Sequence, residues 1–230
     1  MARPRQREAG LSDFDLSSPL GRARAYWSFF WDDHAYFRLL FQNAHWLSPE
    51  MVRANQPWPF QLRAWKARGI RTVLTLRDQP QKAHYVLETD ACERLGLTLV
   101  NFVLASREAP TRDQVLAAKA LFETLEYPCL MHCKSGADRA GVMSVLYSHF
   151  RLGQPIEQAA RQLSFRYGHI RHGETGVLDY VFQHFLDDAD AGVSFEDWVR
   201  RPEYDHERVK ADFTSQWWGT LLTEKLLRRE

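Results

Sequence analysis

The stretch "YPCLMHCKSGADRAGVMS", residues 127–144, decides the fold prediction. It begins as a short apolar run that ends at His132 and Cys133, a pattern typical of a buried strand. A turn containing glycine follows, and the residues after Arg139 favour a helix. A strand, a tight turn and a helix in this order bring the backbone amides of residues 134–138 to the amino end of the helix, where an anion binds. The stretch therefore predicts an anion site with Cys133 at its edge.

Two side chains of this turn are suited to act on a bound anion. Cys133 begins the loop, and the helix dipole, the amides and Arg139 all favour its thiolate form. Arg139 lies in the first helical turn and can present its planar fork to two oxygens of a tetrahedral oxyanion. We expect Lys134 to face the same anion, because a lysine is rarely buried without a partner. The turn thus predicts nucleophilic chemistry on a phosphate group.

The sequence around this stretch alternates helical and strand patterns. We expect strands over residues 70–77, 97–104 and 128–133, and helices over residues 61–69, 109–127, 140–153 and 155–168. Thr111 and Gln114 have the spacing of a capping box at the start of one of these helices. Short apolar strands that alternate with helices predict an α/β fold, with a central, mostly parallel sheet flanked by helices.

The two ends of the chain differ from this central part. Residues 1–20 lack apolar periodicity and predict a flexible tail. Residues 21–187 form the main domain, which begins with an aromatic segment that we expect to pack against the rest of the domain. Residues 188–230 predict a helical C-terminal extension.

Composition excludes several classes of protein. The chain has 30 lysines and arginines against 29 acidic residues, so no global field favours nucleic acid as a partner. Three cysteines in 230 residues argue against a disulfide framework and fit a reducing compartment. No apolar run reaches the roughly 18 to 20 residues that span a bilayer. We therefore expect a cytoplasmic protein, with peripheral membrane contact through the aromatic segment as an open alternative.

The segment "HCKSGADRAG", residues 132–141, resembles the His-Cys-five residues-Arg signature of the cysteine-dependent protein tyrosine and dual-specificity phosphatases. The resemblance extends over about residues 42–187, and "GIRTVLTLR", residues 69–77, is similar to the opening of the compact dual-specificity phosphatases. It implies the α/β fold of that superfamily, in its compact atypical branch of bacterial and lipid phosphatases, with residues 21–187 as the catalytic domain.

The resemblance also implies a mechanism that needs no metal and no cofactor. Cys133 attacks phosphorus to form a phosphocysteine, and water then hydrolyses this intermediate. His132 supports the loop, and Gly136 lets the backbone turn inward without a Cβ. The amides of the loop and one guanidinium would bind the phosphate and stabilise the transition state, and the residues involved are Lys134, Ser135, Gly136, Ala137 and Arg139.

One departure from the family pattern affects the second chemical step. The family usually carries Ser or Thr after the arginine, and its hydroxyl stabilises the cysteine as a leaving group. This chain has Ala140 at that position, so we expect slow hydrolysis of the phosphoenzyme.

A second departure concerns the general acid. Many relatives carry an aspartate on the loop that corresponds to "ASREAPTRDQ", residues 105–114, where this chain offers Glu108 or Asp113. Asp138 directly precedes Arg139, an arrangement similar to that of myotubularins and Sac-type phosphoinositide phosphatases. We favour Asp138 as the proton donor, with Glu108 or Asp113 as alternatives. A further alternative is that Asp138 only stiffens the loop by pairing with Lys134 or Arg171.

The sequence therefore predicts a cysteine-dependent phosphatase that hydrolyses phosphate monoesters. Its partner would be a phosphotyrosine-containing protein or a phospholipid or inositol phosphate. The alternative is a pseudophosphatase that binds phosphate and acts as an interaction module. The segment around Arg166, His169, Arg171 and His172 either adds contacts to a polyanionic substrate or is an ordinary solvated turn.

Overall fold

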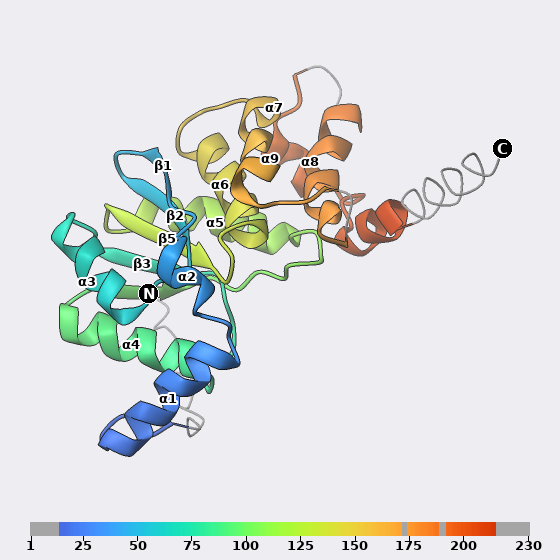
Figure 1. The fold of residues 1–230 in the computed structure, drawn as a ribbon. Helices are drawn as coiled ribbons and strands as arrows, with labels where there is room; N and C mark the ends of the chain where they lie inside the picture. Colours follow the sequence, from blue (N-terminus) through green and yellow to red (C-terminus); the bar gives the residue numbers. More distant parts are fainter. Residues whose placement is uncertain (1–13, 172–173, 189–191, 215–230) are drawn as a thin grey trace.

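The computed structural model describes residues 14–171, 174–188 and 192–214, and the statements below concern these residues (Figure 1). At its centre lies a five-stranded sheet with the strand order β1-β2-β5-β3-β4. The strands are β1 (His45–Ser48), β2 (Met51–Asn55), β3 (Thr72–Thr75), β4 (Thr98–Asn101) and β5 (Cys129–Cys133). Strand β1 is antiparallel to β2, and the other neighbouring pairs are parallel. The predicted mostly parallel sheet is confirmed.

Helices cover both faces of this sheet (Figure 1). The α-helices are α1 (Pro19–Trp31), α2 (Phe37–Leu40), α3 (Pro59–Ala67), α4 (Ala83–Leu95), α5 (Arg112–Thr124), α6 (Asp138–Phe150), α7 (Ile156–Ala159), α8 (Val177–Asp188) and α9 (Phe195–Arg200). The predicted capping box of Thr111 and Gln114 opens α5, and Gly96 ends α4 in the left-handed conformation.

The alternation of side chains along β5 divides the core into two parts. Cys129, Met131 and Cys133 point to one face, where they join a cluster with α5, α6, α8 and α9. Leu130 points to the other face and packs with α3 and α4. Because successive side chains of a strand alternate between faces, Cys133 lies on the side of α6.

The helix predicted over residues 155–168 is wrong in its length. Only α7 and two short 3-10 turns, Ala160–Gln162 and Phe165–Tyr167, form there. The Gln162 carbonyl accepts a hydrogen bond at 2.8 Å from Nη1 of Arg53, a residue of β2. The buried Arg53 guanidinium thus bonds to the Gln162 carbonyl, which in a longer helix would accept from a backbone amide.

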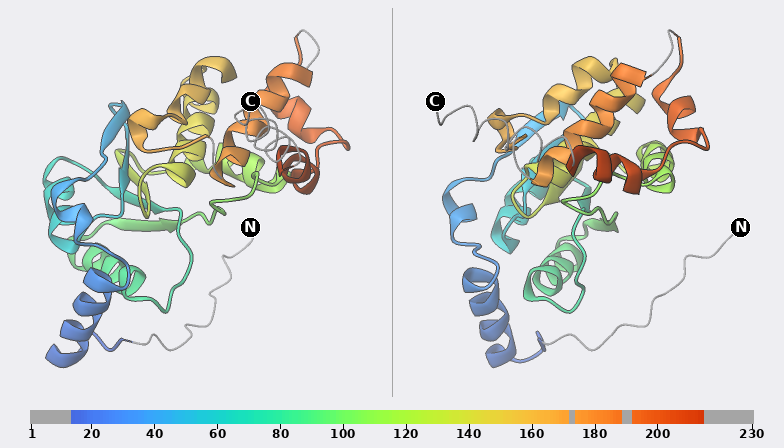
Figure 2. Two further views of the ribbon diagram at one scale, coloured as in Figure 1. Left: turned by 45° about the vertical axis from the view of Figure 1, so that its right-hand side comes forward. Right: turned by 90° about the vertical axis from the view of Figure 1, so that its right-hand side faces the viewer.

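The aromatic segment packs against the domain only in part. Ala25 and Phe29 of α1 are buried against α4, as the sequence predicts. Trp27 and Leu40, however, are 69% and 98% exposed. Figure 2 shows α1 at one end of the molecule, far from α8 and α9.

The described part of the C-terminal extension packs onto the main domain. Phe195 and Trp198 of α9 are buried in the cluster that also holds Phe182 of α8. Residues 1–13 of the predicted tail and residues 215–230 of the predicted extension lie outside the described residues. No helix among the described residues is long and apolar enough to cross a membrane.

Candidate active site

The carboxyl ends of three parallel strands meet beside the predicted anion site. Cys133 at the end of β5 is in register with Asn55 of β2, and His132 is in register with Thr75 of β3. The amide of Leu76, just beyond β3, donates to the His132 carbonyl at 2.9 Å. Ligands bind outside the carboxyl ends of strands in open α/β sheets, so the fold places Cys133 where the chemistry requires it.

The loop between β5 and α6, residues 134–137, turns its carbonyl groups outward. The Gln56 amide donates to the Lys134 carbonyl at 3.4 Å, and Asn43 Nδ2 donates to the Ser135 carbonyl at 3.0 Å. We call residues 133–139 the phosphate loop. Among the described residues, the amides of Lys134, Ser135 and Gly136 have no hydrogen-bond acceptor. Outward carbonyls with free amides make an anion-binding concavity.

Arg53 of β2 holds the far side of this loop. Its Nη2 donates to the carbonyls of Gly136 and Ala137 at 2.7 and 3.0 Å. The side chain is fully buried, and its guanidinium also stacks 4.3 Å from the Tyr167 ring. Burial lowers the pKa of Arg53 to about 10, so the residue stays cationic at neutral pH. Arg53 therefore fixes the direction in which two loop carbonyls point.

Gly136 is required by a close approach of two chain segments. Its φ of 74° lies in the left-handed region, and a Cβ there would lie 2.7 Å from the backbone of Ala54 and Asn55. The loop thus rests directly on β2. The sequence predicted the inward turn at Gly136, and contact with β2 is its physical reason.

Cys133 and Arg139 lie at the two ends of the phosphate loop. The Cys133 residue is 1% exposed, so a phosphate group must enter the loop to meet its sulfur. Nη1 of Arg139 lies 3.5 Å from the Leu76 carbonyl, a weak contact. Among the described residues its buried Nε has no hydrogen-bond partner. Most of the Arg139 fork is therefore available for an oxyanion.

His132 faces away from the loop, towards α4. Its Nε2 lies 2.8 Å from Oε1 of Glu88, and both side chains are buried. Its Nδ1 lies 3.4 Å from the Cys133 carbonyl. The supporting role, in which His132 orients the loop without touching a substrate, stays a prediction.

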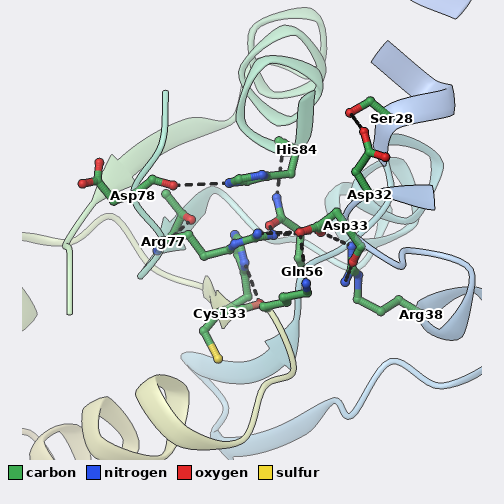
Figure 3. A network of polar contacts seen from close by, with 12 residues as sticks. Ser28, Asp32, Asp33, Arg38, Gln56, Arg77, Asp78, His84 and Cys133 are labelled. Carbon is green, nitrogen blue, oxygen red and sulfur yellow. Dashed lines mark hydrogen bonds and ion pairs between the residues drawn. The ribbon is translucent and has the colours of Figure 1, made fainter. Parts of the chain in front are cut away.

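A polar cluster that we call the Asp33 network borders the loop on the side of α1 (Figure 3). Asp33 follows α1, and its carboxylate accepts from Nη1 and Nη2 of Arg77 at 3.0 and 2.6 Å. Burial alone would raise the pKa of Asp33, but its hydrogen bonds to Arg77 and the charges of Arg77 and Arg38 outweigh it and lower the pKa to about 2. The members are Asp33, Arg38, Gln56, Arg77 and His84.

Lys134 connects this network to the phosphate loop. Its Nζ lies 3.6 Å from Oδ1 of Asp33, and its side chain remains 42% exposed. Such a partly solvated ion pair is weak. Lys134 can therefore turn towards a bound phosphate at little cost.

On the opposite flank of the loop lies a second cluster, the His169 network. Nδ1 of His169 lies 2.8 Å from Oδ1 of Asp138, and Nε2 forms a short contact with Oδ2 of Asp179. Nε of Arg171 donates to Oδ1 of Asp179 at 2.9 Å. Asp138 thus pairs with His169, a partner that the sequence did not suggest, and Arg171 reaches it only through Asp179.

The alternative proton donors lie apart from these contacts. Glu108 is exposed and lies 3.3 Å from Nζ of Lys210, while Asp113 is exposed in the first turn of α5. Neither residue has a described contact with the phosphate loop. The structure also has two cavities of about 380 and 400 Å³, the first beside Trp198 and the second beside Trp65 and Asn43.

The structure therefore brings together the predicted residues of the loop and adds residues that the sequence analysis missed. Arg53 was detectable, because an arginine inside the apolar strand "MVRAN" needs a buried partner. Asn43 and Asp33 carried no comparable signal. Among the described residues, no group of three or more His, Cys, Asp or Glu side chains could hold a metal ion.

Comparisons with known proteins concern the family and the fold of the chain. The model of the family described as "DSP-PTPase phosphatase fused to NAD+ Kinase" matches residues 51–172. The crystal structure of TpbA from P. aeruginosa has a TM-score of 0.51 and 17% identity, over 69% of this chain and 89% of TpbA. Tk-PTP in its active form has a TM-score of 0.50 and 17% identity, over 64% of this chain and 98% of its own. These two likenesses concern the fold. No curated protein matches the chain.

Proposed function

Because the chain belongs to the family of dual-specificity-type phosphatases whose model matches residues 51–172, we propose that it hydrolyses phosphate monoesters through a phosphocysteine at Cys133. The observation that carries this proposal is the orientation of the phosphate loop. Its carbonyls are held outward by Gln56, Asn43 and Arg53, and the amides of Lys134, Ser135 and Gly136 have no acceptor among the described residues. Preorganised amides are the main source of transition-state stabilisation in such a site.

The reaction proceeds in two steps. The Cys133 thiolate attacks phosphorus, and the bond between phosphorus and the leaving oxygen breaks. Water then attacks the phosphocysteine, and the sulfur leaves as thiolate. The loop amides and Arg139 stabilise the equatorial oxygens in both transition states, and Asp138 is the acid–base group nearest to Arg139 in the loop.

The buried thiol favours substrates whose phosphate is carried on an extended arm. Because Cys133 is almost fully covered, a phosphotyrosine reaches the sulfur more easily than a phosphoserine. We therefore propose phosphotyrosine-containing proteins as the first substrate class.

A second substrate class, phospholipids and inositol lipids, is supported by exposed apolar side chains near the loop. Of the 14 large apolar side chains exposed among the described residues, seven lie between Leu20 and Phe41. Nδ2 of Asn55, the register partner of Cys133, donates to the Phe41 carbonyl at 2.5 Å. An apolar segment attached to the end of β2 would contact acyl chains while the headgroup enters the loop.

Turnover of an aryl phosphate by wild-type protein and by Cys133→Ser tests the proposed activity. We expect activity that vanadate inhibits, a radiolabelled phosphoenzyme after acid quenching, and loss of both in Cys133→Ser. Cys129→Ala is the matched control, since Cys129 lies on the same strand and is buried away from the loop. Phosphate binding without turnover in the wild type would instead support the interaction module.

A panel of phosphotyrosine peptides, phosphoserine peptides and phosphoinositide vesicles then separates the two substrate classes.

A further inference from the structure

The His169 network places a buried imidazole ring between two carboxyl groups. An ionised carboxylate has no proton to donate, so it can only accept hydrogen bonds. Nδ1 of His169 faces Asp138 at 2.8 Å, Nε2 faces Asp179, and the His169 side chain is fully buried. A neutral imidazole has one N–H and can satisfy only one of these carboxylates. The ring therefore carries a proton on both nitrogens, unless one of the two carboxyl groups is protonated in its place.

The surroundings of the two carboxyl groups favour their ionised forms. Asp138 and Asp179 lie in the first turns of α6 and α8, where the helix dipole stabilises negative charge. Asp179 also accepts from Arg171, and the charge of Arg53 acts on Asp138. Burial alone would lower the pKa of His169, but its hydrogen bonds to Asp138 and Asp179 outweigh it and raise the pKa to about 9. The negative carboxylates of Asp138 and Asp179 thus lie on either side of the positive His169 ring, and both ring nitrogens keep their protons.

Building on the function proposed above, we propose that His169 is a positioning residue that holds Asp138 as an ionised carboxylate, so that Asp138 acts as the base of the second step and not as the proton donor of the first. In the second step, the oxygen of water bonds to phosphorus, the phosphorus–sulfur bond breaks, and Cys133 leaves as thiolate. Asp138 takes one proton from the water and later releases it to solvent, because its side chain is 24% exposed.

The first step then draws its proton from the substrate. A phosphate monoester monoanion carries one P–OH proton, which moves to the leaving oxygen as the Cys133 sulfur bonds to phosphorus. The products are a neutral alcohol and a dianionic phosphocysteine, so atoms and charges balance without a proton from the protein. In this scheme Asp138 accepts a proton, whereas the sequence analysis favoured it as a proton donor. The sequence-based assignment stays a prediction.

The first arm of the test measures the charge of His169 without any substrate. Nitrogen NMR of the full chain, labelled at histidine and assigned with His169→Gln, reports whether the ring carries one or two protons. We expect two protons at pH 7 and a titration midpoint near pH 9. In Asp138→Asn the midpoint should fall by about 1 to 3 pH units, because one of the two stabilising charges is lost. A wild-type midpoint near the unperturbed value of about 6.5 overturns the proposal, whatever the protein does with phosphate esters.

The second arm separates the two chemical steps in Asp138→Asn. With an activated aryl phosphate, we expect an unchanged phosphorylation burst and a slower steady state, by roughly 10²- to 10⁴-fold. The ratio of phosphorylation rates for aryl and alkyl phosphates should match that of the wild type. Selective loss of the alkyl substrate in the burst identifies Asp138 as the proton donor and overturns the proposal, as does an unchanged steady state.

His169→Gln provides the readout that distinguishes positioning from a purely structural role. We expect a slower second step and loss of the wild-type alkaline limb near pH 9. His149→Gln is the matched control, since Nδ1 of His149 contacts the Gln154 carbonyl, and it should leave burst, steady state and pH profile unchanged. An alkaline limb that persists in His169→Gln contradicts the assignment. Failure of the proposed function is recognised separately, as turnover that survives in Cys133→Ser.

Discussion

On one flank of the phosphate loop the carboxylate of Asp33 lies among guanidinium groups (Figure 3). On the other flank the ring of His169 lies between two carboxylates. Each network also contains a buried histidine, His84 in the first and His169 in the second. Burial, and then the charge of Arg77, lowers the pKa of His84 to about 4, whereas the pKa of His169 is raised to about 9. The same residue type is thus neutral on one flank and charged on the other. Burial and the charge of Arg77 act together on His84, whereas the hydrogen bonds of His169 to two carboxylates outweigh its burial.

The largest effect that tests this comparison is expected from Asp33→Ala. The change leaves Arg38 and Arg77 buried without their carboxylate, and removing one partner of a buried ion pair costs about 3 to 5 kcal/mol. The free energy of unfolding in urea should fall by this amount. Asp32→Ala is the matched control, because the neighbouring Asp32 is exposed and bonds only to Ser28 among the described contacts, and we expect a change within about 0.5 kcal/mol. Equal effects of the two variants would mean that the Asp33 network does not stabilise the fold.

A smaller effect is expected in the pH dependence of stability above neutrality. Between the unfolded pKa of His169, about 6.5, and its folded pKa, about 9, the folded protein binds more protons than the unfolded chain. The stabilisation is therefore fully present below pH 6.5 and is lost as the pH rises through 9, by up to roughly 3 kcal/mol. Unfolding curves from pH 6 to 10 measure this slope, which His169→Gln should remove and His149→Gln should retain. A slope that is the same in all three proteins excludes His169 as its source.

The strand–loop–helix around Cys133 could be predicted from sequence because each of its features is local. An apolar run, a turn with Gly136 and a helix after Arg139 follow one another in 18 residues, and family resemblance adds the chemistry. The Asp33 network and the His169 network could not be predicted in this way. Asp33 meets Arg77 across 44 positions, and Asp138 meets His169 across 31, and no sequence periodicity encodes such pairs.

The direction of proton transfer at Asp138 is the part of the candidate site for which sequence position was least informative. A position directly before Arg139 indicates nearness to phosphate, but the charge of the carboxyl group depends on the partner at its other oxygen. That partner, His169, lies 31 positions later in the chain, after α6, α7 and two short 3-10 turns. Only the folded structure reveals it.

On the acid side, His84 should give the opposite pH dependence to His169. Its folded pKa of about 4 lies below the unfolded value of 6.5, so the unfolded chain binds more protons in this window and stability falls as the pH falls. We expect a loss of about 2 kcal/mol between pH 6.5 and 5. His84→Gln should reduce this loss, while His169→Gln should leave it intact, in unfolding curves measured over that range. If His84→Gln leaves the acid slope unchanged, the two histidines do not differ in charge as proposed.

The smallest effect on stability is expected from Lys134→Met. This variant tests whether Lys134 binds the substrate phosphate or stabilises the fold through Asp33. Nζ of Lys134 lies 3.6 Å from Asp33, and the Lys134 side chain is 42% exposed. Such a partly solvated ion pair contributes at most about 1 kcal/mol. The free energy of unfolding should therefore change little.

Substrate binding should weaken more in Lys134→Met, because a charge-assisted hydrogen bond to phosphate is worth about 1.5 to 3 kcal/mol. We expect KM for an aryl phosphate to rise roughly 10-fold with kcat nearly unchanged, since the contact is made equally in the ground state and the transition state. Lys66→Met, an exposed lysine on α3, controls for the loss of one positive charge and should change neither quantity. If Lys134→Met lowers stability but leaves KM unchanged, Lys134 belongs to the Asp33 network, and the phosphate loop binds its substrate through the amides and Arg139 alone.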